Sequence, residues 1–152
     1  KGLYRTHQFD KVELTHITTK ESEEKEFNQI FNGLKELYKK LGIPHRIITH
    51  RANDMPNKAI IEKDIEFWLA GEERWGEGGS VGMTGNFQAR RGGIKYVGDG
   101  KQEFAHTIYA TGCVANRILI AILNNFQRKD GSVKIPKVLV PYMGGIDVIG
   151  KK

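Results

Sequence analysis

The chain has 152 residues, which is enough for one domain with its own core and too few for two. Its 39% hydrophobic and 28% charged residues are typical of a globular protein and exclude a disordered or fibrous one. The net charge of +6 fits a polyanionic partner such as RNA or a nucleotide, and a merely basic globular protein explains it equally well.

The sequence contains few cysteines and histidines and no long apolar run, which bears on disulfides, metal sites and membrane-spanning helices. Cys113 is the only cysteine, which excludes a disulfide and indicates a reducing compartment, the cytoplasm or an organelle matrix. The five histidines show no spacing typical of metal ligands. No apolar run reaches the roughly 20 residues that a transmembrane helix needs, so we expect no membrane partner.

The opening stretch LYRTHQFDKVEL, residues 3–14, predicts a strand with an unusual face. Read with a period of two, its odd positions include Arg5, Phe9 and Glu13. Phe9 and Glu13 would lie about 13 Å apart at ~3.3 Å per residue, which matches a nucleotide joined to a small acid. Phe9 could stack on a base, Arg5 could pair with phosphate and Glu13 could hold an ammonium group. An edge strand with ordinary surface charges is the open alternative.

Residues 19–42 predict an amphipathic helix. Thr19 or Ser22 can cap it, and acidic residues crowd its first turns. Gly42 and then Pro44 end it. Its apolar positions recur at helical spacing and predict a core-facing stripe: Phe27, Ile30, Phe31, Leu34, Leu37, Tyr38 and Leu41.

Two short strands and a glycine-rich segment follow. The strands are predicted at residues 45–50 and around 65–69, with a polar loop at 51–58. In the glycine-rich segment, Glu77 and Ser80 offer a carboxylate and a hydroxyl that can hold Mg²⁺ within a partial water shell. A flexible glycine hairpin is the alternative that local sequence favours. No clear strand before it or helix after it is predicted, which argues against a dinucleotide-binding loop.

The last third of the chain predicts a strand at 94–97, alternation at 104–109, a helix at 112–127 and an irregular tail packed by Val138, Leu139 and Tyr142. Arg117 lies in this otherwise apolar helix. Burying its charge would be costly without a nearby anion, so the residue either faces an anion or lies in solvent on the polar side of the helix. The order of elements indicates an α+β fold, an antiparallel sheet flanked by helices, in a single domain over 1–152.

Three stretches together resemble the catalytic domain of the seryl-tRNA synthetase family, which are class II aminoacyl-tRNA synthetases. LYRTHQFDKVEL resembles the second half of the family's motif 2. Glu77 and Ser80, followed by FQARR at 87–91, match a second family pattern. The stretch HTIYATGCVANRILIAILNNFQRKDGSVKIPKVLVPYM resembles motif 3 and the family's C-terminal tail. The match is collinear over nearly the whole chain.

The resemblance implies a class II catalytic-domain fold that is truncated on its N-terminal side, before the second half of motif 2. It implies ATP- and Mg²⁺-dependent activation of serine to seryl-adenylate, followed by transfer to tRNA(Ser). We expect serine as a substrate, tRNA(Ser) if the N-terminal part is supplied, and a homodimer or a partner chain. By the same resemblance, Phe9 stacks on adenine, Arg5 holds the nucleotide and Arg117 pairs with the terminal phosphate. Glu77 and Ser80 would hold Mg²⁺.

On the amino-acid side, the resemblance implies that Glu13, Thr111 and Tyr109 face the serine. Tyr109 stands where the family usually has an asparagine, and two further family segments read VGMTGN and ANDMP here. Motif 1 and the arginine that the family places on the α-phosphate lie outside the chain. These departures give a second hypothesis, a catalytically impaired synthetase-like protein with a structural, regulatory or RNA-assembly role. A third is amino-acid activation for a carrier other than tRNA.

Overall fold

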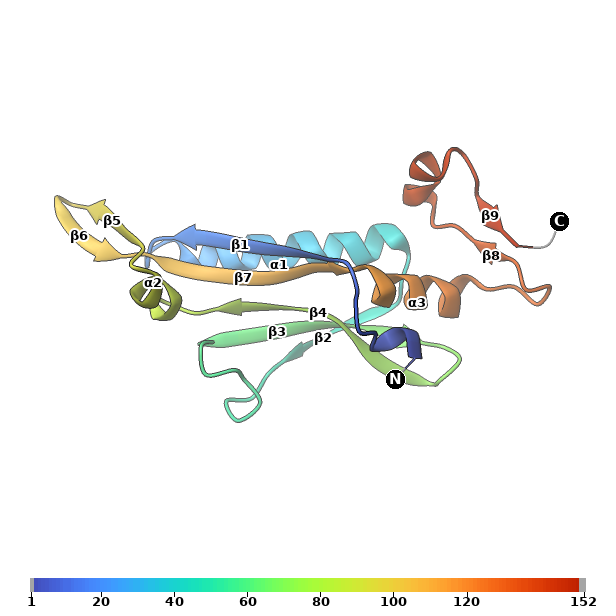
Figure 1. Cartoon of the computed structure of the whole chain (residues 1–152), viewed down its shortest axis with the longest axis horizontal. Helices are drawn as coiled ribbons and strands as arrows, with labels where there is room; N and C mark the ends of the chain where they lie inside the picture. Colours follow the sequence, from blue (N-terminus) through green and yellow to red (C-terminus); the bar gives the residue numbers. More distant parts are fainter. Residues whose placement is uncertain (1, 151–152) are drawn as a thin grey trace.

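A five-stranded antiparallel sheet forms the centre of the computed structural model, which describes residues 2–150. Every neighbouring pair of strands is antiparallel. Their spatial order is β1 (Lys11–Thr18), β7 (His106–Val114), β4 (Arg74–Met83), β3 (Ile61–Leu69) and β2 (His45–Thr49) (Figure 1). The predicted fold, an antiparallel sheet flanked by helices, is confirmed.

Helix α1 (Glu23–Leu41) packs along one face of this sheet. Its first turn is acidic and its last turn contains Lys39 and Lys40, an arrangement that the helix dipole favours. It ends at Gly42, whose φ of 69° is left-handed and whose N–H donates to the Lys39 carbonyl. The predicted helix and its core-facing stripe are confirmed by the buried side chains of Phe27, Phe31, Leu34, Tyr38 and Leu41.

The sheet has one apolar and one polar face, because successive side chains of a strand point to opposite sides. The face toward α1 holds the core residues Ile65, Phe67, Val81, Met83, Ile108 and Ala110. The opposite face carries Glu62 and Asp64 on β3, Ser80 on β4 and Tyr109 on β7. The strand register sets Asp64 beside Ser80, and Gly82 beside Tyr109. This polar face gathers several of the predicted site residues.

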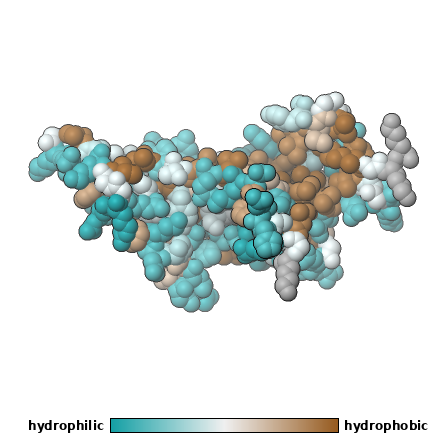
Figure 2. Space-filling model, viewed as in Figure 1, coloured by the Kyte–Doolittle hydropathy of each residue, from teal (hydrophilic) through white to brown (hydrophobic). Residues whose placement is uncertain are grey.

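Shorter elements extend both ends of the sheet (Figure 1). They are η1 (Gly2–Tyr4), α2 (Phe87–Gly92), β5 (Lys95–Gly98), β6 (Lys101–Phe104), α3 (Ala115–Phe126), β8 (Val133–Lys134), η2 (Lys137–Met143) and β9 (Val148–Ile149). Figure 2 shows hydrophilic residues over most of the visible face and apolar residues gathered near α3 and the C-terminal segment. Among the helices of residues 2–150, none is long and apolar enough to cross a membrane.

The predicted strand at residues 3–14 is wrong for its first part. Residues 2–4 form η1, residues 5–10 are irregular, and β1 begins only at Lys11. The reason is pairing: Lys11 lies opposite Val114, where β7 ends and α3 begins. The earlier residues therefore have no β7 partner, and Arg5 and Phe9 do not share a strand face with Glu13.

The glycine-rich segment at 71–93 forms regular structure instead of a flexible hairpin. Residues 74–83 of it form β4, a strand with a neighbour on each side, and three residues separate the end of β4 from α2. Its glycines are sites of close packing: a Cβ built on Gly78 would lie 2.1 Å from the Tyr38 hydroxyl oxygen. A Cβ on Gly82 would lie 2.3 Å from Cζ of Tyr109. The prediction failed because local composition does not reveal which aromatic rings fold against a glycine.

The remaining elements follow the predictions with shifted bounds. The strands at 45–49 and 95–98 are confirmed, and the strand predicted near 65–69 runs longer, over 61–69. The second helix starts at 115, because residues 112–114 complete β7. In the tail, Leu139 packs against the core as predicted, whereas Tyr142 is 84% exposed and Val138 is also exposed.

Candidate functional site

Arg5, Phe9 and Arg117 meet at the junction of η1, β1 and α3. They line a cavity of about 30 Å³ together with Tyr4, Thr6, Val114 and Asn116. Two hydrogen bonds fix the junction: Asn116 Nδ2 donates to the Leu3 carbonyl at 2.7 Å, and the Ala115 N–H donates to the Asp10 carbonyl at 2.9 Å. Arg5, Phe9 and Arg117 therefore come together as expected. The irregular segment 5–10 brings them together, and not the strand that was predicted to begin at residue 3.

Arg117 is held by the strand that carries Glu77. Its Nη1 lies 3.0 Å from Glu77 Oε1 and donates to the Glu77 carbonyl at 3.2 Å. Only 12% of the Arg117 side chain is exposed, so the solvated alternative is wrong. The Glu77 side chain is 44% exposed and stays accessible from outside. The pair holds the Arg117 guanidinium in place beside the cavity that Arg5 and Phe9 also line.

Tyr4 completes this cluster, and the sequence reading missed it. Its hydroxyl donates to the Glu77 carbonyl at 3.0 Å. The Arg117 guanidinium lies 5.0 Å from its ring centroid, within the range of a cation–π contact. Burial is the main cause that raises the pKa of Tyr4, which keeps it a neutral donor. Its position directly before Arg5 was the only available signal.

Glu13 and Thr111 face each other across β1 and β7. The Thr111 hydroxyl donates to Glu13 Oε2 at 3.2 Å, and Lys11 Nζ lies 2.8 Å from the same oxygen. Because Val81 pairs with Ala110, Ser80 lies beside Thr111 on the neighbouring strand. Glu13, Thr111 and Ser80 therefore form a polar row across three strands.

Tyr109 lies one step further along the same face. Its hydroxyl donates to Glu62 Oε1 at 2.9 Å, and both residues are buried. Burial, followed by the hydrogen bond to Glu62, raises the Tyr109 pKa well above its ordinary value. Lys58 Nζ lies 3.8 Å from the ring centroid. The ring thus fills the space over Gly82 and ends on a buried carboxylate.

A second buried carboxylate, Asp64, lies next to Glu62 on the same face of β3. Asp64 Oδ2 lies 2.8 Å from Nε2 of His50, and its Oδ1 has no hydrogen-bond partner within the described residues. Contact with the Asp64 carboxylate, which favours the protonated imidazole, is the main cause that raises the His50 pKa. The sequence reading missed these groups; the signal was the alternation of acidic residues in IIEKDIEF.

The chain is similar in sequence to one protein family and to several members of it. The model of the tRNA synthetase class II core domain (G, H, P, S and T) matches residues 1–126. The serine–tRNA ligase of Fusobacterium nucleatum is 42% identical over 151 residues, covering 99% of this chain and 36% of that protein. The serine–tRNA ligase of Paracoccus denitrificans is 43% identical over 151 residues, covering 98% of this chain and 35% of that protein.

Two solved structures share the fold over the whole described chain. Seryl-tRNA synthetase from Pyrococcus horikoshii, complexed with ATP, superposes with a TM-score of 0.95 at 34% identity, covering 100% of this chain and 34% of that one. The cytoplasmic serine–tRNA ligase of Naegleria fowleri, in complex with AMP, gives a TM-score of 0.92 at 32% identity, covering 99% and 36%. The chain thus spans about a third of the length of the relatives that it matches.

Proposed function

We propose a function from the premise that this chain belongs to the tRNA synthetase class II core-domain family, whose model matches residues 1–126. The function is ATP-dependent activation of serine and transfer to tRNA(Ser), with this chain supplying part of the catalytic site. One observation carries the proposal. The Arg117–Glu77 pair lies beside Arg5 and Phe9, on the same sheet as the Glu13–Thr111–Ser80 row.

The nucleotide end of the proposed site is the junction around Arg117. Phe9 is 54% exposed, so its ring offers a surface on which adenine can stack. Arg5 and Arg117 supply positive charge for the phosphates, and the contacts of Arg117 with Glu77 and Tyr4 fix its position before a ligand arrives. Attack of a carboxylate on the α-phosphorus depends on positioning and on neutralised charge. Arg5, Phe9 and Arg117 would serve part of both needs, and the arginine that the family places on the α-phosphate would have to come from outside the chain.

Mg²⁺ is the metal that this proposal includes. Within residues 2–150 no group of three or more His, Cys, Asp or Glu side chains could hold a metal ion by itself. A Mg²⁺ that bridges phosphates needs only one or two protein oxygens, and the exposed Glu77 carboxylate with the Ser80 hydroxyl fits that donor set. When bound, the ion would neutralise phosphate charge.

The amino-acid end would use Glu13, Thr111 and Ser80. The Glu13 carboxylate can accept from an ammonium group while Thr111 holds it in place. Tyr109 supports the second hypothesis, because its ring fills the space over Gly82 beside this row. A pocket narrowed in this way favours either a catalytically impaired synthetase-like protein or one that takes another amino acid or another carrier.

Two measurements test the proposal. Calorimetry should detect Mg²⁺-ATP binding to the chain, and Arg117→Ala should weaken it; no binding to well-folded protein would count against the nucleotide site. Serine-dependent pyrophosphate exchange should then be assayed with the remainder of the Fusobacterium nucleatum enzyme supplied as a separate polypeptide. ATP binding without exchange for any amino acid would favour the impaired protein, and exchange with a different amino acid would favour the other substrate.

A further inference from the structure

Three carboxylates follow one another along the polar face of β3, at Glu62, Asp64 and Glu66. Glu62 accepts a hydrogen bond from the Tyr109 hydroxyl at 2.9 Å, and Glu66 accepts one from Arg46 Nε at 2.6 Å. Asp64 differs from both, because its Oδ1 is buried and has no hydrogen-bond partner within residues 2–150. The unpartnered oxygen thus belongs to the middle one of the three carboxylates.

The surroundings of Asp64 hold its carboxylate in one orientation. Asp64 is 9% exposed, and its Oδ2 lies 2.8 Å from Nε2 of His50, the residue that follows β2. Because the two oxygens of a carboxylate point apart, Oδ1 is directed away from His50. Buried polar atoms in native proteins nearly always have a hydrogen-bond partner, so an exception of this kind indicates a donor that is still to be engaged.

Ser80 is the residue of β4 that lies directly opposite Asp64. Residues in that relation share a face of the sheet, and their Cβ atoms are about 4.5–5.5 Å apart. A hydroxyl oxygen and a carboxylate oxygen that lie between two such Cβ atoms can meet at hydrogen-bond distance. The neighbouring carboxylates have no such partner, because the residues opposite Glu62 and Glu66 are a glycine and a glutamate. Ser80 is therefore the donor that the position of Asp64 selects.

Ser80 becomes a stronger hydrogen-bond donor when its oxygen holds Mg²⁺. A hydroxyl group has one proton and two lone pairs, so it can bind a cation through its oxygen and still donate its proton. A bound cation draws electron density from that oxygen and makes the proton more acidic. A carboxylate is a good acceptor for such a proton, because the hydrogen bond is charge-assisted. The Oδ1 of Asp64 is the acceptor that lies opposite Ser80.

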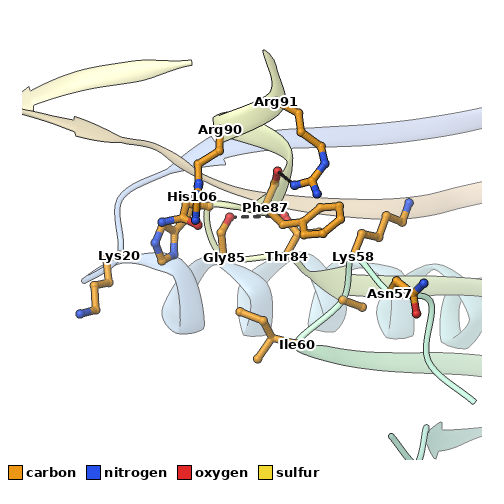
Figure 3. Close-up of a pocket in the computed structure, with 12 residues that line it drawn as sticks. Lys20, Asn57, Lys58, Ile60, Thr84, Gly85, Phe87, Arg90, Arg91 and His106 are labelled. Atoms are coloured by element: carbon orange, nitrogen blue, oxygen red, sulfur yellow. Dashed lines mark hydrogen bonds between the residues drawn. The ribbon is translucent and has the colours of Figure 1, made fainter. Parts of the chain in front are cut away.

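Charge is unevenly distributed along the polar face, which limits where a cation can bind. Beyond Gly82 the strands reach a cavity of about 820 Å³ whose walls include Lys58 and Arg90 (Figure 3). None of the described residues that line this cavity is acidic. A cation is repelled from that end of the sheet and attracted to the carboxylates of β3 and β4. The neighbourhood of Ser80 and Asp64 is therefore the favourable place for Mg²⁺.

We propose that Asp64 is a positioning residue for Ser80. Its Oδ1 accepts the proton of the Ser80 hydroxyl in a hydrogen bond when the hydroxyl oxygen holds Mg²⁺, while His50 fixes Oδ2. This inference rests on the proposed function, because the ion enters the site with ATP. Asp64 itself does not bind the ion; it keeps the lone pairs of the Ser80 oxygen directed toward it. Partners behind a metal ligand act in this way in many metal sites.

Calorimetric titration of the chain with ATP, with and without Mg²⁺, tests the proposal without turnover. The ratio of the two dissociation constants gives the gain in ATP affinity from Mg²⁺. Asp64→Ala should reduce this gain by roughly tenfold or more, since losing the partner behind a metal ligand typically costs about 10–100-fold. Asp64→Asn should keep part of the gain, because its amide oxygen can still accept. The matched control Glu62→Gln removes the same charge from the same face of β3, opposite a glycine, and should leave the gain nearly unchanged.

A double-mutant cycle with Ser80→Ala separates positioning from a structural role. Because Asp64 acts through Ser80, Asp64→Ala should cause no further loss of the gain when residue 80 is alanine. Thermal melting checks folding, and Asp64→Asn replaces Asp64→Ala in the cycle if the latter does not fold.

Three results would overturn the proposal: equal losses in both backgrounds, an unchanged gain in the Asp64 variants, or an equal loss in Glu62→Gln. A crystal structure with Mn²⁺-ATP should also place Ser80 Oγ about 2.5–2.7 Å from Asp64 Oδ1, and direct binding of Oδ1 to the ion would contradict a positioning role. If the folded wild type binds no ATP, or gains nothing from Mg²⁺, the nucleotide or metal site of the proposed function fails and this inference fails with it. A gain that does not depend on Asp64 removes this inference alone.

Discussion

Replacing Tyr109 with phenylalanine tests how the polar sheet face is stabilised. The variant removes one hydroxyl, which donates to Glu62 Oε1 at 2.9 Å between two buried side chains. The Glu62 oxygen would lose its partner without gaining water. Leaving a buried acceptor unsatisfied costs about 1–3 kcal/mol, and more when it is charged. We expect Tyr109→Phe to lower the free energy of unfolding by about 2 kcal/mol.

The assay is urea unfolding followed by circular dichroism, with thermal melting as a second measure. For a domain of this size, about 2 kcal/mol corresponds to a fall in Tm of roughly 4–8 °C. Tyr96→Phe is the matched control, because the Tyr96 hydroxyl donates to Glu103 at 3.2 Å on an exposed hairpin. Water can replace that contact, so the control should change stability by less than about 0.5 kcal/mol.

The same pair sets an alkaline limit on stability. The ordinary pKa of tyrosine is 10.0, and burial and Glu62 raise that of Tyr109 in the folded protein. Above pH 10 this tyrosine ionises in the unfolded chain but keeps its proton in the folded chain. Rising pH therefore favours the unfolded state and lowers the free energy of unfolding. The contribution of Tyr109 to the free energy of unfolding is complete below pH 10 and is lost as the pH rises toward the pKa of Tyr109 in the folded protein. The reasoning is refuted if Tyr109→Phe and Tyr96→Phe destabilise the protein equally.

Three further changes extend these expectations. Gly82→Ala should destabilise the protein by about 1–3 kcal/mol in urea unfolding, because the new Cβ would meet the Tyr109 ring. Gly33→Ala is the contrasting change, since a Cβ at this helix position would meet no neighbour, and it should stabilise the protein by roughly 0.5–1 kcal/mol. His50→Gln should lower the free energy of unfolding more at pH 6 than at pH 9. Because the His50 pKa is raised in the folded protein, its stabilising contribution is complete below pH 6.5 and is lost as pH rises. Equal losses of stability at both pH values would contradict this expectation. Arg117→Lys should weaken Mg²⁺-ATP binding in calorimetry by roughly tenfold, since lysine lacks the planar fork that contacts Glu77, and unchanged affinity would remove Arg117 from the nucleotide site.

Local sequence patterns predicted the two longer helices and most strands of the five-stranded sheet. Helix α1 follows from its apolar spacing and the glycine at its end, both of which act within a few residues. The start of β1 could not be predicted in this way, because it depends on where β7 stops, about a hundred positions later. The strand β4 was missed because its glycines are explained by close approach of residues distant in sequence, such as Tyr38 to Gly78 and Tyr109 to Gly82.

Resemblance to long family motifs predicted roles for Glu77, Ser80 and Arg117, whereas the groups around them appear only in the contacts between distant segments. Tyr4 lies 73 positions from Glu77, and Glu62 lies 47 positions from Tyr109. Neither pair can be found from spacing along the chain. The burial of the Glu62 and Asp64 carboxylates likewise depends on tertiary packing.

The spacing of Glu77 and Ser80 shows how a site can contradict the period of the strand that carries it. Residues three apart on a regular strand point to opposite faces, so Glu77 and Ser80 should be separated. The register of β3 and β4 shifts at this point: Ile65 pairs with Gly79 and Glu66 pairs with Glu77, leaving Gly78 as an extra residue. This bulge turns Glu77 onto the face that holds Ser80.

A second register shift falls beside Glu13, where Gly112 is the extra residue on β7. In both shifts the extra residue is a glycine next to a carboxylate of the proposed site: Gly78 follows Glu77 on β4, and Gly112 lies on β7 across from Glu13. Glycine in a strand often marks a bulge or a close approach, and at Gly78 a Cβ would collide with Tyr38 of α1. The contact between Gly78 and Tyr38 of α1 thereby links the apolar core to the face on which β4 presents Glu77.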